Sequence, residues 1–268
     1  MNINFLSLAS GSSGNCYYLG TDTYGILIDA GIGIRTIKKI LKEYNLSLDS
    51  ILGVFVTHDH ADHIKAVGTL GEKYGIPVYT TQEIYVGINK NYCMTEKLSP
   101  ASVRFIQKEV PFQLKNFQIT CFEVPHDGTD NVGYSIEVGG KVFSFLTDLG
   151  HITSTAAHYI GKTNYLVLEA NYDEEMLRMG PYPQYLKERI AGANGHMCNR
   201  DTAEFLAENL HEGLKFVALC HLSKENNHPE LAYKTMEMFL RNKGVAIGRD
   251  IQLTVLKRNT PSGFFVFS

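Results

Sequence analysis

The segment His58-Asp59-His60-Ala61-Asp62-His63 brings three histidines and the carboxylate of Asp62 together within six residues. It directly follows the apolar run Val54-Phe55-Val56-Thr57, which predicts a β-strand. At the turn after a strand, alternate side chains can converge on neighbouring points, and imidazole and carboxylate groups are ligands for zinc, manganese or iron. A solvated surface cluster is the alternative, but so dense a run of ligands is costly without a metal. The segment therefore predicts a metal site.

The rest of the chain predicts an ordinary globular protein. It has 268 residues, of which 44% are hydrophobic and 20% charged, and this composition argues against disorder. The length allows one large domain or two small ones. Because no linker or internal repeat divides the sequence, we expect a single domain over residues 1–268. Five cysteines without a Cys-x-x-Cys pair favour buried hydrophobic roles over disulfides.

Charge and hydropathy restrict the partners and the location of the protein. A formal net charge of -3 gives no general attraction for a polyanion, so nucleic-acid binding would need a local basic patch or the metals themselves. The first ten residues lack the features of a signal peptide, and no apolar run approaches the length of a membrane span. We therefore expect a cytoplasmic protein without a membrane partner.

Hydrophobic periodicity predicts alternating strands and helices. Helical spacing links Ile34, Ile37 and Leu41, and a second helix over residues 203–210 has Asn199 or Asp201 as its expected N-cap. His228 before Pro229 predicts a third helix start. Layered α/β folds in general satisfy this pattern. The predicted strands cover residues 4–9, 24–29, 53–57, 117–124, 132–138, 142–147, 165–169 and 216–219.

The His-x-His-x-Asp-His pattern after a strand resembles the signature of the metallo-β-lactamase superfamily. This resemblance implies an α/β fold, a four-layer αβ/βα sandwich with metals at one edge of the sheets. Four further motifs of the superfamily are present in order, each at or after an expected strand: Asp29 before this segment, and His126, Asp148 and His221 after it.

Carried over by position, the resemblance implies two divalent metal ions, Zn²⁺ or Mn²⁺. It assigns His58, His60 and His126 to the first metal and Asp62, His63 and His221 to the second, with Asp148 as the bridge and Asp29 as support for the metal loop. Asp62 and Asp148 also have catalytic roles in this assignment. Two metals make hydroxide available near neutral pH, which implies hydrolysis but leaves lactam, thioester and phosphodiester substrates open.

A second constellation narrows the substrate class. Glu169 ends an expected strand, and Gly195-His196-Met197 precedes an expected helix. This arrangement resembles phosphodiesterases such as the tRNA 3'-processing endonucleases, and the resemblance implies that Glu169 orients His196 as a phosphate ligand or general acid. The alternative is a solvated strand end and an unremarkable loop histidine.

The overall pattern is most similar to the YycJ/WalJ-like family of bacterial proteins. Three segments carry this resemblance: Leu8-Ala9-Ser10-Gly11-Ser12-Ser13-Gly14-Asn15, Gly195-His196-Met197-Cys198-Asn199 and His221-Leu222-Ser223-Lys224-Glu225-Asn226-Asn227. It implies a 5'-to-3' exonuclease acting on DNA, with Ser12, Ser13 and Asn226 near the substrate. The Gly/Ser segment reads equally well as a tight turn.

Two competing functions remain at this point. A thioester hydrolase of the glyoxalase type would share the metal motifs without needing Glu169 and His196, and a non-enzymatic binding protein would not need a full ligand set. Four basic residues near the expected site either contact phosphates or form a solvated face: Lys187, Arg189, Arg200 and Lys224.

Overall fold

The computed structural model describes residues 1–268, and its chain forms two compact units, each built on one seven-stranded mixed sheet. The first unit comprises Met1–Val110, Gly128–Asn131 and Lys257–Ser268. The second comprises Pro111–Asp127 and Val132–Leu256. No helix is both long and apolar enough to cross a membrane.

The sheet of the first unit has the strand order β14-β1-β2-β3-β4-β5-β6. Its antiparallel half is β14 (Ser262–Phe267), β1 (Ile3–Ala9), β2 (Cys16–Gly20) and β3 (Gly25–Ile28). From β3 the order continues in parallel through β4 (Ile51–Phe55), β5 (Val78–Thr80) and β6 (Val103–Phe105). The parallel strands are joined through helices: α1 (Ile34–Glu43), α2 (Ala61–Ile64), α3 (Val67–Tyr74) and α4 (Gln82–Lys90), with short 3-10 turns at Leu48–Ser50 and Pro100–Ser102.

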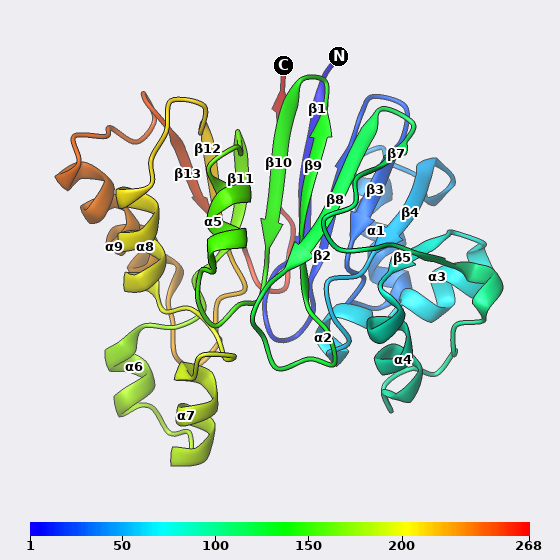
Figure 1. Cartoon of the computed structure of the whole chain (residues 1–268), viewed down its shortest axis with the longest axis horizontal. Helices are drawn as coiled ribbons and strands as arrows, with labels where there is room; N and C mark the ends of the chain where they lie inside the picture. Colours follow the sequence, from blue (N-terminus) through cyan, green and yellow to red (C-terminus); the bar gives the residue numbers. More distant parts are fainter. The chain divides into compact units, whose positions relative to one another are not determined.

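The sheet of the second unit has the order β13-β12-β11-β10-β9-β8-β7. Strands β7 (Phe112–Leu114), β8 (Phe117–Glu123), β9 (Val132–Val138) and β10 (Lys141–Leu146) are antiparallel. Strands β11 (Tyr165–Glu169), β12 (Phe216–Cys220) and β13 (Gln252–Val255) continue from β10 in parallel. The helices are α5 (Ser154–Ile160), α6 (Glu174–Met179), α7 (Gln184–Ala191), α8 (Asn199–Glu208) and α9 (Pro229–Asn242) (Figure 1).

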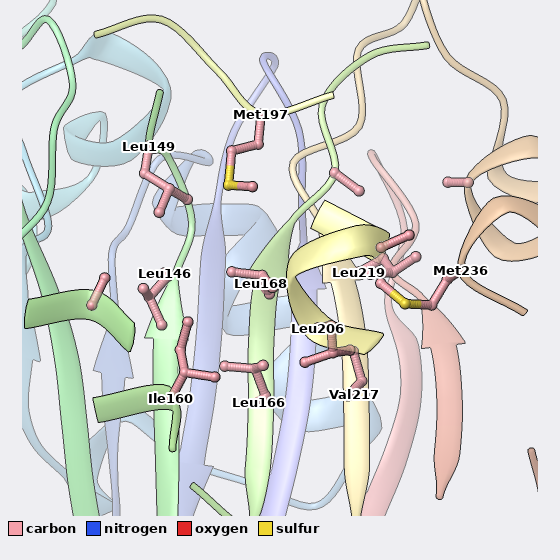
Figure 2. Packing of buried hydrophobic residues seen from close by; sticks show 14 of the residues in the cluster. Leu146, Leu149, Ile160, Leu166, Leu168, Met197, Leu206, Val217, Leu219 and Met236 are labelled. Atoms are coloured by element: carbon pink, nitrogen blue, oxygen red, sulfur yellow. The ribbon is translucent and has the colours of Figure 1, made fainter. Parts of the chain in front are cut away.

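One hydrophobic core holds α5, α8 and α9 against the second sheet. Leu166 and Leu168 alternate with residues of the opposite face of β11, and they pack in one cluster with Ile160 of α5, Leu206 of α8 and Met236 of α9 (Figure 2). Leu149 and Met197 belong to the same cluster. Since these two residues flank Asp148 and His196 in the sequence, the packed core fixes the backbone at both positions.

The long predicted elements are confirmed, and one detail is wrong. The eight predicted strands correspond to β1, β3, β4 and β8 to β12, and the helices at residues 34 and 229 begin where they were expected. Helix α8, however, is capped by Cys198, whose Sγ accepts a hydrogen bond from Asp201 N at 3.3 Å. Asn199 does not cap because its buried amide pairs with that of Asn227, through bonds of 2.9 and 2.8 Å.

Candidate metal centre

The His58–His63 motif runs from the loop after β4 into α2 in the first unit, with His60 as the N-cap and Asp62 and His63 inside the helix. His58 and His63 are buried, whereas His60 and Asp62 are partly exposed. The ring centroid of His58 lies 4.6 Å from that of His60 and 4.1 Å from that of His63. The three imidazoles therefore converge, as the turn after β4 predicts.

Asp29 contacts His63 of this motif and the preceding residue Thr57. Its backbone is left-handed (φ 58°) and its carboxylate is fully buried. Oδ1 accepts a hydrogen bond from Thr57 N at 2.8 Å, and Oδ2 lies 2.7 Å from His63 Nδ1. Burial raises the pKa of Asp29, while the interactions with His63 and Thr57 act to lower it. Its position fits the expected support of the metal loop, because a carboxylate on one ring nitrogen directs the other toward a metal.

Thr57 is a functional candidate that the sequence reasoning missed. Its Oγ1 donates to Asp29 Oδ2 at 2.8 Å and lies 3.0 Å from His58 Nδ1. Because this hydroxyl donates its proton to the Asp29 carboxylate, its oxygen can accept a hydrogen bond from Nδ1–H of His58. Asp29 thus orients His63 directly and His58 through Thr57. The available signal in the sequence was a hydroxyl residue at the end of an apolar strand, directly before the histidines.

The Gly/Ser segment is tied to the motif by Asn15, which was also missed. The Asn15 amide nitrogen lies 2.9 Å from His63 Nε2 and 3.3 Å from Asp62 Oδ2, and its oxygen accepts from Gly11 N at 2.9 Å. Ser12 and Ser13 at the tip are exposed. The segment is therefore a turn anchored to the metal motif, and the contact of its serines with substrate stays a prediction.

The second unit gathers another set of ligand groups at one sheet edge. Asp148, Glu169 and His221 follow or end the neighbouring parallel strands β10, β11 and β12. His196 joins them from the loop before α8, and one ligand atom from each of the four residues lies within 4.8 Å of the others. His126 follows β8, and its Nε2 lies 3.8 Å from Asp148 Oδ1.

Glu169 contacts two histidines and is the central residue of this set. Its fully buried Oε1 lies 2.7 Å from His196 Nδ1 and 2.9 Å from His221 Nδ1. Oε2 accepts from the backbone nitrogens of Leu149 at 3.0 Å and Met197 at 3.2 Å. Burial would raise the pKa of Glu169, but the charge of His196 and the hydrogen bonds from both histidines outweigh it and lower that pKa.

This geometry supports the expected pairing of Glu169 with His196 and adds His221 as a second partner. Asn171 also fixes His221, since its amide nitrogen donates to the His221 carbonyl oxygen at 2.8 Å. His221 itself has a left-handed backbone (φ 54°). The Asp148 carboxylate lies 3.0 Å from His221 Nδ1.

The loop before His196 also fixes His126. His126 Nδ1 donates to the carbonyl oxygen of Gly195 at 2.8 Å, and His196 N donates to that of Ile190. His151, which follows β10, donates from Nδ1 to the Ala193 carbonyl oxygen at 2.9 Å. The loop therefore contacts residues that follow β8 and β10.

Asn226 occupies a different environment from the exposed serines. It is fully buried, its backbone nitrogen donates to Ser223 Oγ at 3.2 Å, and its Oδ1 has no hydrogen-bond partner. Its expected role near the substrate stays a prediction.

The donor chemistry of both sets fits a divalent metal. Imidazole and carboxylate groups are present, whereas the cysteines are free and, apart from Cys93, buried. Burial raises the pKa of the Cys198 thiol, two residues after His196, to about 12. No cysteine belongs to either set, and imidazole and carboxylate ligands suit zinc or manganese.

Comparison with known proteins supports this reading. Residues 24–215 match the model of the β-lactamase superfamily domain. The chain is 34% identical to exodeoxyribonuclease YycJ of Bacillus anthracis, covering 94% of this chain and 95% of the relative. It is 35% identical to exodeoxyribonuclease WalJ of Streptococcus pneumoniae, covering 92% and 91%. The metallo-β-lactamase fold protein YhfI of Bacillus subtilis superposes over 100% of both chains with a TM-score of 0.71 at 15% identity.

Proposed function

This chain belongs to the metallo-β-lactamase superfamily, in the branch that contains the exodeoxyribonucleases YycJ and WalJ, and from this premise we propose that it is a metal-dependent DNA exonuclease. The fold expected from the sequence is confirmed, and the relatives are hydrolases. The observation that carries the proposal is the Glu169–His196 pair, because an oriented histidine can bind a scissile phosphate or protonate its leaving oxygen, whereas thioester hydrolysis at the same metal motifs has no need of the pair.

We propose that two divalent metals, Zn²⁺ or Mn²⁺, bind as the motifs imply. His58, His60 and His126 would hold the first and Asp62, His63 and His221 the second, with Asp148 as the bridge. When bound, such metals supply hydroxide near neutral pH and polarise the phosphorus–oxygen bond. The clustered imidazoles and the buried carboxylates support this assignment.

His196 is the group of this chain that we assign to the leaving oxygen. Its Nδ1 is engaged by Glu169, so Nε2 is the atom that can meet a phosphate. Its side chain is 19% exposed, whereas that of Glu169 is fully buried. Substrate can therefore reach His196 but not its partner. With Nδ1 hydrogen-bonded to the Glu169 carboxylate, Nε2 is the ring nitrogen positioned to bind the phosphate and to donate a proton to the leaving oxygen.

The test is degradation of end-labelled single- and double-stranded DNA and RNA by the purified protein of measured metal content. We expect DNA to be degraded from its ends, and a comparison of 5' and 3' labels tests the predicted 5'-to-3' direction. Asp148→Ala, purified identically, controls for contaminating nucleases. If the protein hydrolyses a glyoxalase-type thioester but cleaves neither DNA nor bis(p-nitrophenyl) phosphate, the thioesterase alternative replaces the proposal.

A further inference from the structure

The four basic residues singled out in the sequence have different environments. Lys187 donates from Nζ to the Arg178 carbonyl oxygen at 2.7 Å, where it caps α6. Lys224 is 70% exposed and pairs with its neighbour Glu225. Arg200 is an exposed residue in the first turn of α8. None of these three makes a hydrogen bond or an ion pair with a side chain next to a predicted metal ligand.

Arg189, in the last turn of α7, differs because a carboxylate holds it beside a predicted metal ligand. Arg189 Nε lies 2.6 Å from Asp127 Oδ2, and Asp127 Oδ1 lies 3.5 Å from His126 Nε2. The arginine side chain remains 57% exposed. Its hydrogen bond within the protein uses Nε, so the donors on Nη1 and Nη2 make no hydrogen bond to the protein.

The backbone around Arg189 places it near the proposed catalytic histidine. The loop that begins just after it runs to Gly195, whose carbonyl oxygen accepts from His126, and His196 N bonds back to Ile190. Arg189, His126 and His196 thus border the same short loop. An arginine fixed through Nε keeps the planar pair of Nη donors that matches two phosphate oxygens.

We propose that Arg189 binds a phosphate of the nucleic-acid strand next to the scissile one. This inference rests on the proposed function and extends it to how the substrate is held. The charge of Asp127 offsets part of the charge of Arg189 and weakens its attraction for free anions. A phosphate that the strand already holds in place loses less entropy on binding, and this favours the strand over inorganic phosphate.

The experiment measures binding of a fluorescent, nuclease-resistant phosphorothioate DNA to the metal-loaded protein at several salt concentrations. We expect Arg189→Ala to bind roughly 10-fold more weakly at low salt, the scale of one charged hydrogen-bonding contact. The slope of log affinity against log salt should fall by about 0.9, because one phosphate contact is lost. Arg189→Lys should restore part of the affinity and part of the slope, since lysine keeps the positive charge but lacks the paired donors of the guanidinium group.

Arg249→Ala is the matched control. Arg249 is 75% exposed and pairs with Asp250, and it lies before β13, at the opposite end of the parallel strands from Glu169 and His221. The Arg249→Ala variant should bind DNA with the same dependence of affinity on salt as the parent protein.

A parent-like slope in Arg189→Ala overturns the proposal. A parent-like slope together with a lower metal content would show that Arg189 positions Asp127 and His126 and does not bind a phosphate. A parent protein that neither binds nor degrades DNA overturns the proposed function, and this inference with it.

Discussion

Asp148 combines burial with contacts to several histidines, so its removal should have a severe effect. If it bridges two metals, Asp148→Ala leaves adjacent cations without their shared counter-charge. We expect the metal content to fall below two per chain and hydrolysis of every substrate to be lost. Metal analysis and cleavage of bis(p-nitrophenyl) phosphate measure both. The exposed carboxylate of Asp250 offers a control through Asp250→Ala, and a fully active Asp148→Ala with two metals would refute the bridging role.

Metal content should distinguish the effects of substituting His196 and Glu169. His196→Ala should keep both metals and lose roughly 10²-fold or more in phosphodiesterase rate, the scale of a lost general acid. Because Glu169 also contacts His221, we expect Glu169→Gln to impair metal retention in addition to rate. The double variant should lose less than the product of the two defects. Wild-type rates in His196→Ala would contradict the assignment.

Thr57 can be tested with two substitutions of similar size. Thr57→Val removes the hydroxyl that lies between Asp29 and His58, whereas Thr57→Ser keeps it. Lost outer hydrogen bonds to metal ligands typically weaken metal affinity by about 10-fold or more. In a competition with a chromogenic chelator, we expect Thr57→Val to show this loss of metal affinity and Thr57→Ser to bind metal almost as tightly as the parent protein. Equal affinities for the two variants would show that the hydroxyl has no such role.

At the scale of elements, the loop before His196 depends on a close backbone approach at Gly150. A Cβ on Gly150 would lie 2.0 Å from the Ala193 carbonyl oxygen, so an alanine must displace backbone. We expect Gly150→Ala to lower the phosphodiesterase rate and the free energy of unfolding, by roughly 1–3 kcal/mol for the latter. Urea unfolding and rate measurements test this. Gly161→Ala is the control, because a Cβ there would meet its nearest atom at 3.3 Å; equal stability of the two variants would contradict the expectation.

The long strands and helices were predictable because each repeats a hydrophobic pattern over several residues. Strands β5, β6 and β7 have only three residues each, too few to show a period. Strand β2 contains no β-branched residue and ends in Gly20, so its composition gives little indication of a strand. The cap of α8 was missed because the amide of Asn199 is used elsewhere in the fold.

At the scale of the whole molecule, metal removal should affect both activity and stability. Chelation should abolish hydrolysis, and added zinc or manganese should restore it, because the predicted ligands are imidazoles and carboxylates. A ligand that binds only the folded state also stabilises it, by about 2.7 kcal/mol at 100 times its dissociation constant. We therefore expect a lower Tm for the metal-free protein. Undiminished turnover by verified metal-free protein would contradict the mechanism.

The sequence by itself determined the chemistry that is local along the chain. His58, His60, Asp62 and His63 are contiguous and follow a strand, so their convergence needs only the geometry of a turn. The tertiary structure alone decided which distant residues support the site. Asn15 reaches His63 across 48 positions, Glu169 reaches His221 across 52, and Arg189 reaches Asp127 across 62. Such contacts depend on strand order and loop paths, which side-chain periodicity does not encode.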